Sequence, residues 1–375
     1  MTIETPSEGG QAASLVGRIP VRNLWLLMLY ASDLLRHLGA ASVAVEDNPD
    51  DIADLVAEIL AQSVEARLKQ SLTPSYTGRH AIVNRVRGRI DLLETERKRL
   101  LDKGAIACDF AELTVDNARN RYVKAALKAI VPLLKRKDLA SRCRTLSERM
   151  ARNGVKGGAP TRSEISVDRI GRADARDHMM IAASRLAFDL ALPTEAAGQI
   201  RTFEPDRELV WIRKLYEKAV AGFYDFKLRP EGWNVHPGKI VAWQVEMQTS
   251  GIDAILPTMK YDIVLENARL GHRIVVDTKF NSLLTKGWYR DETLRSGYLY
   301  QMYAYLQSQV RPDDAMSSQS TGLLLHPAIG EEVDETAKIQ GHAIRFASVD
   351  LSVGAESIRR RLLEVATSQA LFEHT

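Results

Sequence analysis

The sequence predicts an α+β protein of two domains, an N-terminal domain of helices with a small β-unit and a C-terminal α/β core. Its 375 residues, 45% of them hydrophobic, are enough for two separate cores. Up to about residue 203 the apolar residues mostly recur at helical spacing, whereas beyond Pro205 short strand-like runs alternate with helices. We therefore predict a disordered leader at residues 1–15, an N-terminal domain at 16–203 and a C-terminal domain at 204–375.

Composition and charge limit the classes of protein to which the chain can belong. The net charge is only +3, so contact with nucleic acid would have to depend on local basic patches. Cys108 and Cys143 have no metal-ligand spacing, which argues against a disulfide framework or a zinc site and indicates a reducing compartment. The apolar run from Leu24 to Ala31 is far shorter than the roughly 18 residues that a membrane helix needs. We expect a soluble, cytoplasmic protein without a membrane partner.

Most of the N-terminal domain is predicted to be helical, because its apolar residues recur every three or four positions. The predicted helices are one that follows Ile19-Pro20 and extends to about Leu38, one from about Asp51, and others at 117–137, 139–152 and 173–190. Pro132 predicts a kink or an early end within the third of these, because proline removes a helical hydrogen bond.

An arginine-rich stretch between Pro74 and Ile90 interrupts this helical pattern. Gly78-Arg79-His80 and the residues from Asn84 onward combine glycine with alternating side chains, which predicts a hairpin or a small β-unit. Such a unit could be a solvated sheet edge, or its arginines could contact nucleic acid or a protein partner. The sequence leaves both interpretations open.

The C-terminal domain is predicted to begin with a strong helix, Arg207 to Phe226, and to continue as a compact mixture of strands and helices. The predicted elements after that helix are strands at 241–246, 260–265 and 273–280, a helix at 291–307, strands at 322–325 and 343–346, and a closing helix after Gly354. This order is typical of an α/β core with a mixed sheet.

Two acids and a lysine mark the ends of neighbouring predicted strands. Asp262 precedes one apolar run, and Asp277 and Lys279 follow the next one. An antiparallel hairpin would bring the two carboxylates together, and strand alternation points Asp277 and Lys279 to the same face.

This arrangement suits the metal-dependent hydrolysis of a phosphodiester. Mg²⁺ prefers carboxylate oxygens, with water and phosphate as its remaining ligands, so Asp262 and Asp277 are the predicted metal ligands. The Lys279 ammonium could orient or help to deprotonate the attacking water, and could offset charge in the transition state.

The acid-x-lysine triplet alone is a weak indicator, because the chain also contains Glu96-Arg97-Lys98 and Asp225-Phe226-Lys227. Those triplets lie in a charged helical stretch and at a helix end, whereas Asp277 follows a β-branched run and has a partner acid upstream. A salt-bridge cluster at a sheet edge would nevertheless show the same three residues.

Further residues are predicted to support the site. Glu217, on the helix before the strands, could add a carboxylate that faces the metal, or could be an ordinary exposed glutamate. Gln301 and Tyr305 are spaced i, i+4 on the helix after the strands, so they share a face that could contact DNA or steady the lysine. Arg290 and Arg295 could bind phosphate or remain solvated.

Several motifs, in order along the chain, resemble the McrC family, the nuclease subunits of modification-dependent McrBC restriction systems within the PD-(D/E)xK nuclease superfamily. The resemblance is carried by Ile19–Leu24, Val86–Ile90, Asn120-Arg121, Ile255–Ile263, Ile274–Phe280, Leu299–Met302 and Gly322–Pro327. These stretches cover most of the chain, and the first is the most diagnostic. One departure is Tyr261, which occupies the place of the superfamily's proline before the first acid.

The resemblance implies that the C-terminal domain is a restriction-endonuclease-like PD-(D/E)xK nuclease core, with Asp262 and Asp277 as metal ligands, Lys279 as the catalytic lysine and Mg²⁺ as the cofactor. It implies modified double-stranded DNA as the substrate. It also implies that the N-terminal domain binds the central pore of a hexameric AAA+ GTPase ring, McrB, and stimulates it. The chain has no Gly-x-x-x-x-Gly-Lys-[Ser/Thr] loop, so GTP would be bound by the partner.

The predicted function is therefore a Mg²⁺-dependent DNA endonuclease subunit that cuts together with a GTPase partner. Two alternatives stay open. One is a non-catalytic adaptor that only activates a motor NTPase and keeps the carboxylates as an ion pair. The other is a stand-alone PD-(D/E)xK repair nuclease.

Overall fold

The computed structural model describes residues 19–35, 49–161, 164–165, 177–198, 205–280, 284–285, 293–330 and 332–367; the leader predicted at residues 1–15 lies outside them. The chain forms two compact units. Ala53–Leu192 form the middle unit, and Met1–Ile52 together with Pro193–Thr375 form the sheet unit. Both contain helices and strands, which confirms the predicted α+β class.

The first helix belongs to the sheet unit and not to the unit that follows it in the sequence. The division after Leu192 lies near the predicted boundary at residue 203, but the prediction placed all of residues 16–203 together. Helix α2 (Val21–Tyr30) instead packs against α11 (Pro205–Leu228) of the sheet unit. The division of the chain therefore differs from the predicted one at its N-terminal end.

Aromatic packing and side-chain hydrogen bonds hold α2 in the sheet unit. The rings of Tyr30 and Phe223 meet edge to face, with centroids 5.0 Å apart. Asn23 Nδ2 donates to the carbonyl oxygens of Leu351 and Val353, at 2.7 and 2.9 Å. The buried face of α2 thus finds its partners far along the chain, which helical spacing within α2 cannot indicate.

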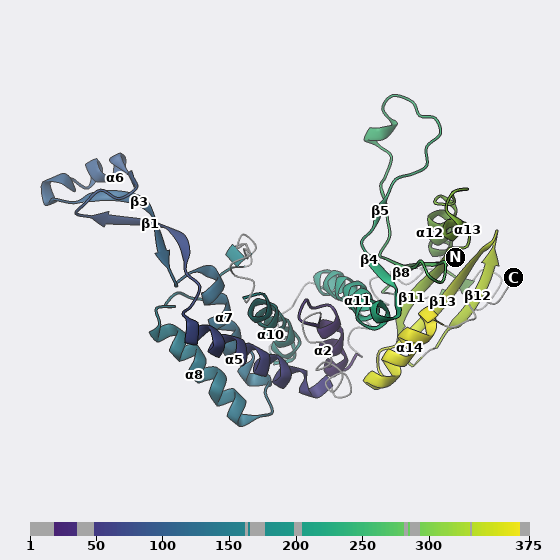
Figure 1. Cartoon of the computed structure of the whole chain (residues 1–375), viewed down its shortest axis with the longest axis horizontal. Coiled ribbons are helices and arrows are strands. Elements are labelled where there is room, and N and C mark those ends of the chain that lie inside the picture. Colours follow the sequence, from purple (N-terminus) through teal and green to yellow (C-terminus); the bar gives the residue numbers. More distant parts are fainter. Residues whose placement is uncertain are drawn as a thin grey trace, which may run out of the picture. The chain divides into compact units, whose positions relative to one another are not determined.

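The middle unit consists of helices and a short antiparallel sheet. Its helices are α5 (Ile52–Gln70), α6 (Leu92–Arg97), α7 (Ala118–Ala129), α8 (Lys137–Arg152) and α10 (Asp177–Gly198), and its strands are β1 (Ser75–Val83), β2 (Arg89–Ile90) and β3 (Ile106–Thr114). The strands pair in the order β1-β3-β2, which confirms the predicted β-unit (Figure 1). Helix α7 ends before Pro132, as predicted, and a 3₁₀ turn follows.

A buried aspartate joins the helices of the middle unit. Asp177, at the start of α10, accepts hydrogen bonds from Arg67 on α5 at 2.8 Å and from Arg119 on α7 at 2.9 Å. Thr73 Oγ1 donates to the same carboxylate at 2.8 Å. The two guanidinium groups offset a charge whose burial would otherwise be costly.

The sheet unit is built on a six-stranded mixed sheet in the order β12-β13-β11-β8-β7-β4. Its strands are β4 (Asn234–Pro237), β7 (Ile263–Asn267), β8 (His272–Thr278), β11 (Thr321–Ala328), β12 (Asp334–Ile339) and β13 (His342–Asp350). Strand β5 (Ile240–Val241) pairs with β6 (Met259–Lys260), and β9 (Leu284–Thr285) with β10 (Thr293–Leu294). The remaining helices are α12 (Ser296–Gln307), α13 (Ala315–Ser318) and α14 (Ala355–Thr367). Strands β8, β11 and β13 run parallel, and the other neighbours in the sheet are antiparallel.

Several predicted boundaries are corrected. The strand predicted at 241–246 is wrong beyond Val241, where β5 ends. The helix predicted from about residue 291 begins at Ser296, and the first helix ends at Tyr30, short of its predicted extent to about Leu38, a residue that lies outside the described ones. Strands β4 and β12, at the two edges of the sheet, were not predicted. Among the described helices, none is both long and apolar enough to cross a bilayer.

Helices lie against both faces of the sheet (Figure 1). On one face, α12 packs Met302 into a core with Val264 and Val275. On the other face, Arg345 of β13 donates to the carbonyl oxygen of Val365 in α14, at 3.1 Å. The sheet is thus the middle layer of the unit, and α12 covers the face to which residues 262, 264, 275 and 277 point.

The contact between α2 and α11 leads to a stability prediction. A Cβ on Gly222 of α11 would lie 1.9 Å from the carbonyl oxygen of Tyr30, so Gly222→Ala forces the two helices apart. We expect it to lower the free energy of unfolding by about 1–3 kcal/mol in urea denaturation. Gly297→Ala is the matched control in α12, because its Cβ meets no atom within 4 Å and alanine favours the helix. Equal stability of the two variants would contradict the close approach.

Candidate active site

The β7–β8 hairpin brings the two predicted metal ligands together. Ile263 pairs with Val276, and the same antiparallel register, continued by one residue, sets Asp262 opposite Asp277. Opposed residues on an antiparallel pair point to the same face, with Cβ atoms about 4.5–5.5 Å apart. Gly271 turns the chain between the strands with a φ of +67°, a conformation that residues with a Cβ rarely adopt. The predicted hairpin is confirmed.

Lys279 lies beside Asp277, as strand alternation predicts. Its Nζ is 3.0 Å from Oδ1 and 2.8 Å from Oδ2 of Asp277. The backbone N–H of Lys279 donates to the carbonyl oxygen of Leu325 at 3.1 Å, which continues the pairing of β8 with β11. On its other side the ammonium lies 5.3 Å from the ring centroid of Tyr298, within the range of a cation–π contact. The cation is therefore held between a carboxylate and an aromatic ring.

Thr278 orients the second carboxylate. Asp262 Oδ2 accepts hydrogen bonds from the backbone N–H of Thr278 at 2.8 Å and from its hydroxyl at 3.0 Å. The strand that carries Asp277 thus also fixes the side chain of Asp262. A carboxylate held by two donors has little freedom to turn away from the site.

Burial and repulsion between carboxylates raise the pKa values of Asp277 and Glu217. Burial raises the pKa of the Asp277 carboxyl to about 6, Asp262 and Glu217 act in the same direction, and Lys279 opposes them. Burial also raises the pKa of Glu217, with Asp262 adding to the effect. Burial alone would lower the pKa of Lys279, but Asp277 and Asp262 outweigh it and hold that pKa above its ordinary value. The carboxylates of Asp262, Asp277 and Glu217 therefore lie close enough to act on one another, and Glu217 belongs to the group.

Helix α12 is fastened to the strand that leads into the site. Gln301 Nε2 donates to the Tyr305 hydroxyl at 2.6 Å, and that hydroxyl donates to the carbonyl oxygen of Lys260 at 2.9 Å. In return the Tyr261 hydroxyl donates to the carbonyl oxygen of Tyr305 at 3.0 Å, and the two tyrosine rings pack edge to face. Gln301 and Tyr305 thus position the entry to β7, and Tyr305 also helps to raise the pKa of Lys279.

The oxygen donors of this cluster fit a hard divalent cation. Asp277 Oδ2 is buried and accepts no hydrogen bond from the described residues, although Lys279 Nζ lies at ion-pair distance. Asp262 is oriented from the same strand, and Glu217 is half-buried beside it. Carboxylate oxygens are the protein ligands that Mg²⁺ prefers. Asp262, Asp277 and Glu217 are therefore the residues that could hold such an ion.

The structure describes all of the predicted site residues except Arg290. The structure brings Asp262, Asp277, Lys279 and Glu217 together and places Gln301 and Tyr305 on the neighbouring helix. Of the two arginines considered for phosphate, Arg290 lies outside the described residues and Arg295 directly precedes α12.

From the sequence alone we predicted no role for Thr278 or Tyr298. The spacing of Tyr298 with Gln301 and Tyr305, at i, i+3 and i+7, would have placed it on the same helical face. Thr278 offers no comparable signal, because its bond to Asp262 depends on the pairing of the two strands.

Comparison with known proteins assigns the chain to a family. A family model described as McrBC 5-methylcytosine restriction system component matches residues 5–316. The chain belongs to this family. The resemblance to McrC proteins that the motifs indicated is thereby confirmed.

A curated relative matches nearly the whole chain. The Type IV methyl-directed restriction enzyme EcoKMcrBC of Escherichia coli (strain K12) is 24% identical over 350 residues, which cover 92% of this chain and 97% of the relative.

Two solved structures from Thermococcus gammatolerans are also similar. A refined half-complex from a tetradecameric assembly of McrB AAA+ hexamers with bound McrC covers 84% of this chain and 68% of that chain, with 14% identity and a TM-score of 0.36. The cryo-EM structure of the McrBC complex covers 52% of this chain and 58% of that chain, with 16% identity and a TM-score of 0.29.

The role of Tyr305 can be tested through stability. Tyr305→Phe removes the hydroxyl that joins Gln301 to Lys260 but keeps the ring beside Tyr261. We expect a loss of roughly 1–2 kcal/mol in the free energy of unfolding, measured by urea denaturation. Tyr300→Phe on the same helix, where the side chain is 68% exposed, should change it by less than about 0.5 kcal/mol. If both variants unfold alike, the hydroxyl does not fasten α12.

Proposed function

We propose that this protein is the Mg²⁺-dependent DNA endonuclease subunit of an McrBC-type restriction system. The proposal depends on one observation: Asp262 and Asp277 oppose each other across the β7–β8 hairpin, with Lys279 beside them. It is supported by membership of a family described as a 5-methylcytosine restriction system component and by likeness to a methyl-directed restriction enzyme. The substrate that we propose is modified double-stranded DNA.

The residues of the cluster have distinct proposed roles. Asp262, Asp277 and Glu217 would hold Mg²⁺, which when bound supplies Lewis-acid polarisation of the scissile phosphate and lowers the pKa of water. Lys279, with its pKa above the ordinary value, keeps its positive charge at neutral pH and offsets negative charge that develops on the phosphate. The Tyr298 ring and the Asp277 carboxylate keep this ammonium in place.

We propose further that a separate AAA+ GTPase ring of the McrB type acts with this chain. The family description names a component of a system, which implies further subunits. We assign the docking role to the middle unit, which contains most of the N-terminal domain predicted for that role and in which Leu92, Leu93 and Leu101 are 67%, 85% and 65% exposed. Exposed apolar groups of this kind mark protein-binding surfaces. GTP would bind to the partner, since this sequence has no phosphate-binding loop.

Substitution of Asp277 tests the catalytic assignment. In a mixture of protein, partner GTPase, GTP, Mg²⁺ and methylated DNA, we expect Asp277→Ala to lower the cleavage rate by at least about a hundredfold, because it removes a metal ligand. Stimulation of GTP hydrolysis should persist, because the proposed docking surface is in the other unit. Asp313→Ala, at an exposed acid of the sheet unit, is the matched control and should cut normally.

The same assay separates the alternatives. Cleavage by the wild-type protein without the partner would favour a stand-alone nuclease. If wild type and Asp277→Ala stimulate the partner equally and neither cuts DNA, the protein is an adaptor whose Lys279–Asp277 contact is only a buried ion pair.

The raised pKa of Asp277 predicts that Mg²⁺ binding weakens on acidification. The carboxyl must be ionised to bind the ion, and with a pKa of about 6 only about one tenth of it is ionised at pH 5. The Mg²⁺ association constant should therefore fall about tenfold per pH unit below 6 and level off above 7, as measured by isothermal titration calorimetry. An aspartate with an ordinary pKa would keep its affinity down to about pH 5, which would contradict the assignment.

A further inference from the structure

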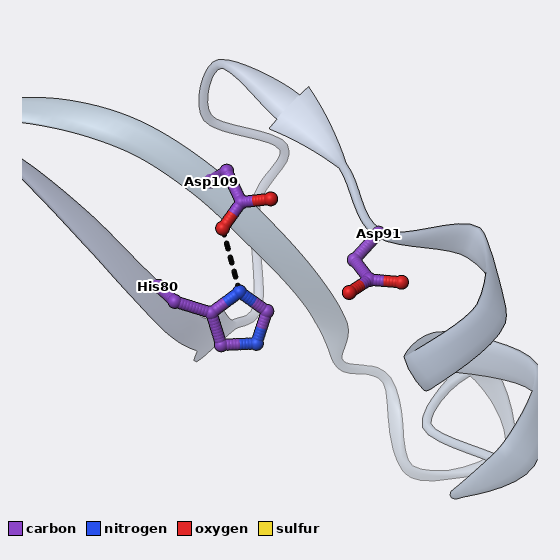
Figure 2. A group of neighbouring side chains, drawn as sticks. All are labelled: His80, Asp91 and Asp109. Carbon is purple, nitrogen blue, oxygen red and sulfur yellow. Dashed lines mark hydrogen bonds and ion pairs between the residues drawn. The ribbon is translucent and has the colours of Figure 1, made fainter.

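A second group of ionisable side chains lies in the middle unit, and the proposed nuclease chemistry does not use it. His80 of β1, Asp109 of β3 and Asp91, directly before α6, converge on one another (Figure 2). One ligand-type atom from each residue lies within 4.8 Å of the others. The three residues come from three separate segments of the chain, so their meeting is a product of the fold.

The backbone fixes this convergence. The β1–β3 ladder pairs His80 directly with Asp109. The backbone N–H of Asp91 donates to the carbonyl oxygen of Ala107 at 2.9 Å, which holds the start of α6 against β3. Asp91 Oδ1 accepts the backbone N–H of Glu94 at 2.9 Å and so caps α6. The Asp91 carboxylate is thereby oriented at the helix end, where Figure 2 shows it beside the imidazole.

Negative charge exceeds positive charge in this group. His80 Nδ1 lies 2.6 Å from Asp109 Oδ1, and Nε2 contacts Glu94. These two carboxylates raise the pKa of His80. Lys98 Nζ pairs with Glu94 at 2.5 Å, so one ammonium and one imidazole face the three carboxylates of Asp91, Glu94 and Asp109. A dication would balance the charge of the group.

We propose that His80, Asp91 and Asp109 form a binding site for a divalent transition-metal ion such as Zn²⁺. An imidazole nitrogen combined with carboxylate oxygens suits Zn²⁺ and related ions, whereas Mg²⁺ prefers oxygen ligands. The His80 side chain is 43% exposed, so the ion reaches the site from solvent. A bound ion joins β1, β3 and the start of α6, and so stiffens the small sheet.

Zinc titration of the metal-free, full-length protein tests this site. The double substitution Asp262→Asn, Asp277→Asn provides the parent protein, because it removes the acids of the sheet unit that could also bind the ion. We expect one equivalent of Zn²⁺ to bind in isothermal titration calorimetry, and His80→Gln or Asp109→Asn to weaken binding at least about tenfold.

His236→Gln is the matched control for the histidine substitution. The His236 side chain is 46% exposed and lies 3.5 Å from a carboxylate of Glu266 in the sheet unit, so it resembles His80 in exposure and in having an acidic neighbour. We expect His236→Gln to leave the affinity for zinc unchanged. Equal loss of affinity in His80→Gln and His236→Gln would overturn the assignment.

X-ray absorption provides a second readout, which does not depend on the affinity measured by calorimetry. The zinc complex of the parent protein should show scattering from one imidazole, and this signal should disappear in His80→Gln. Zinc should also raise the melting temperature of the parent but not of that variant, because only the folded site binds the ion. A parent protein that binds no zinc, or binds it without imidazole scattering, overturns the proposal. Neither result bears on DNA cleavage, so the two proposals fail separately.

Discussion

The register of one antiparallel pair, β7 with β8, is the constraint on which the site depends. Side chains on a strand alternate between faces, so a slip of one residue would send Asp277 to the opposite side of the sheet. The buried pair Val264–Val275 secures the register on the face that α12 covers, directly next to the two acids. Arg273 and Glu266, the following pair on that face, form an ion pair at 2.9 Å. Apolar burial thus determines where the charges meet.

The same burial imposes an energetic cost that explains the composition of the cluster. The rise in the pKa of Asp277 from 3.8 to about 6 corresponds to roughly 3 kcal/mol against its ionised form. This net cost already contains the opposing effect of Lys279 and the repulsion from Asp262 and Glu217. A cluster that contains more carboxylates than cations is unfavourable as a purely structural ion pair. A bound dication would make such a cluster favourable, and strongly shifted acids are typical of functional sites.

Apolar runs beside Asp262 and Asp277 made the central hairpin predictable, because a strand that is buried on both faces consists of consecutive apolar residues. The edge strands were not predictable in this way: β12, Asp334–Ile339, is exposed along most of its length and reads as a polar loop. Strand β5 ends at Val241 because its pairing with β6 ends, although apolar residues continue beyond it. The contacts of α2 and the bond from Thr278 to Asp262 join distant segments, and no local pattern encodes such partners. Local periodicity therefore predicted the two opposed acids, while the residues that orient them required the fold.

Burial also explains how two carboxylate clusters in one chain can favour different ions. In the sheet unit Asp277 is 2% exposed and the proposed ligand atoms are all oxygens, so the proposed Mg²⁺ ion would be held by strong electrostatic attraction. In the middle unit the Asp109 side chain is 55% exposed, and solvent screens the same kind of charge. Carboxylates alone would hold an ion weakly there. In the proposed site the nitrogen of His80 adds affinity, because a bond from imidazole to a metal ion is less weakened by solvent screening than the attraction of a carboxylate. Imidazole also favours ions such as Zn²⁺ over Mg²⁺.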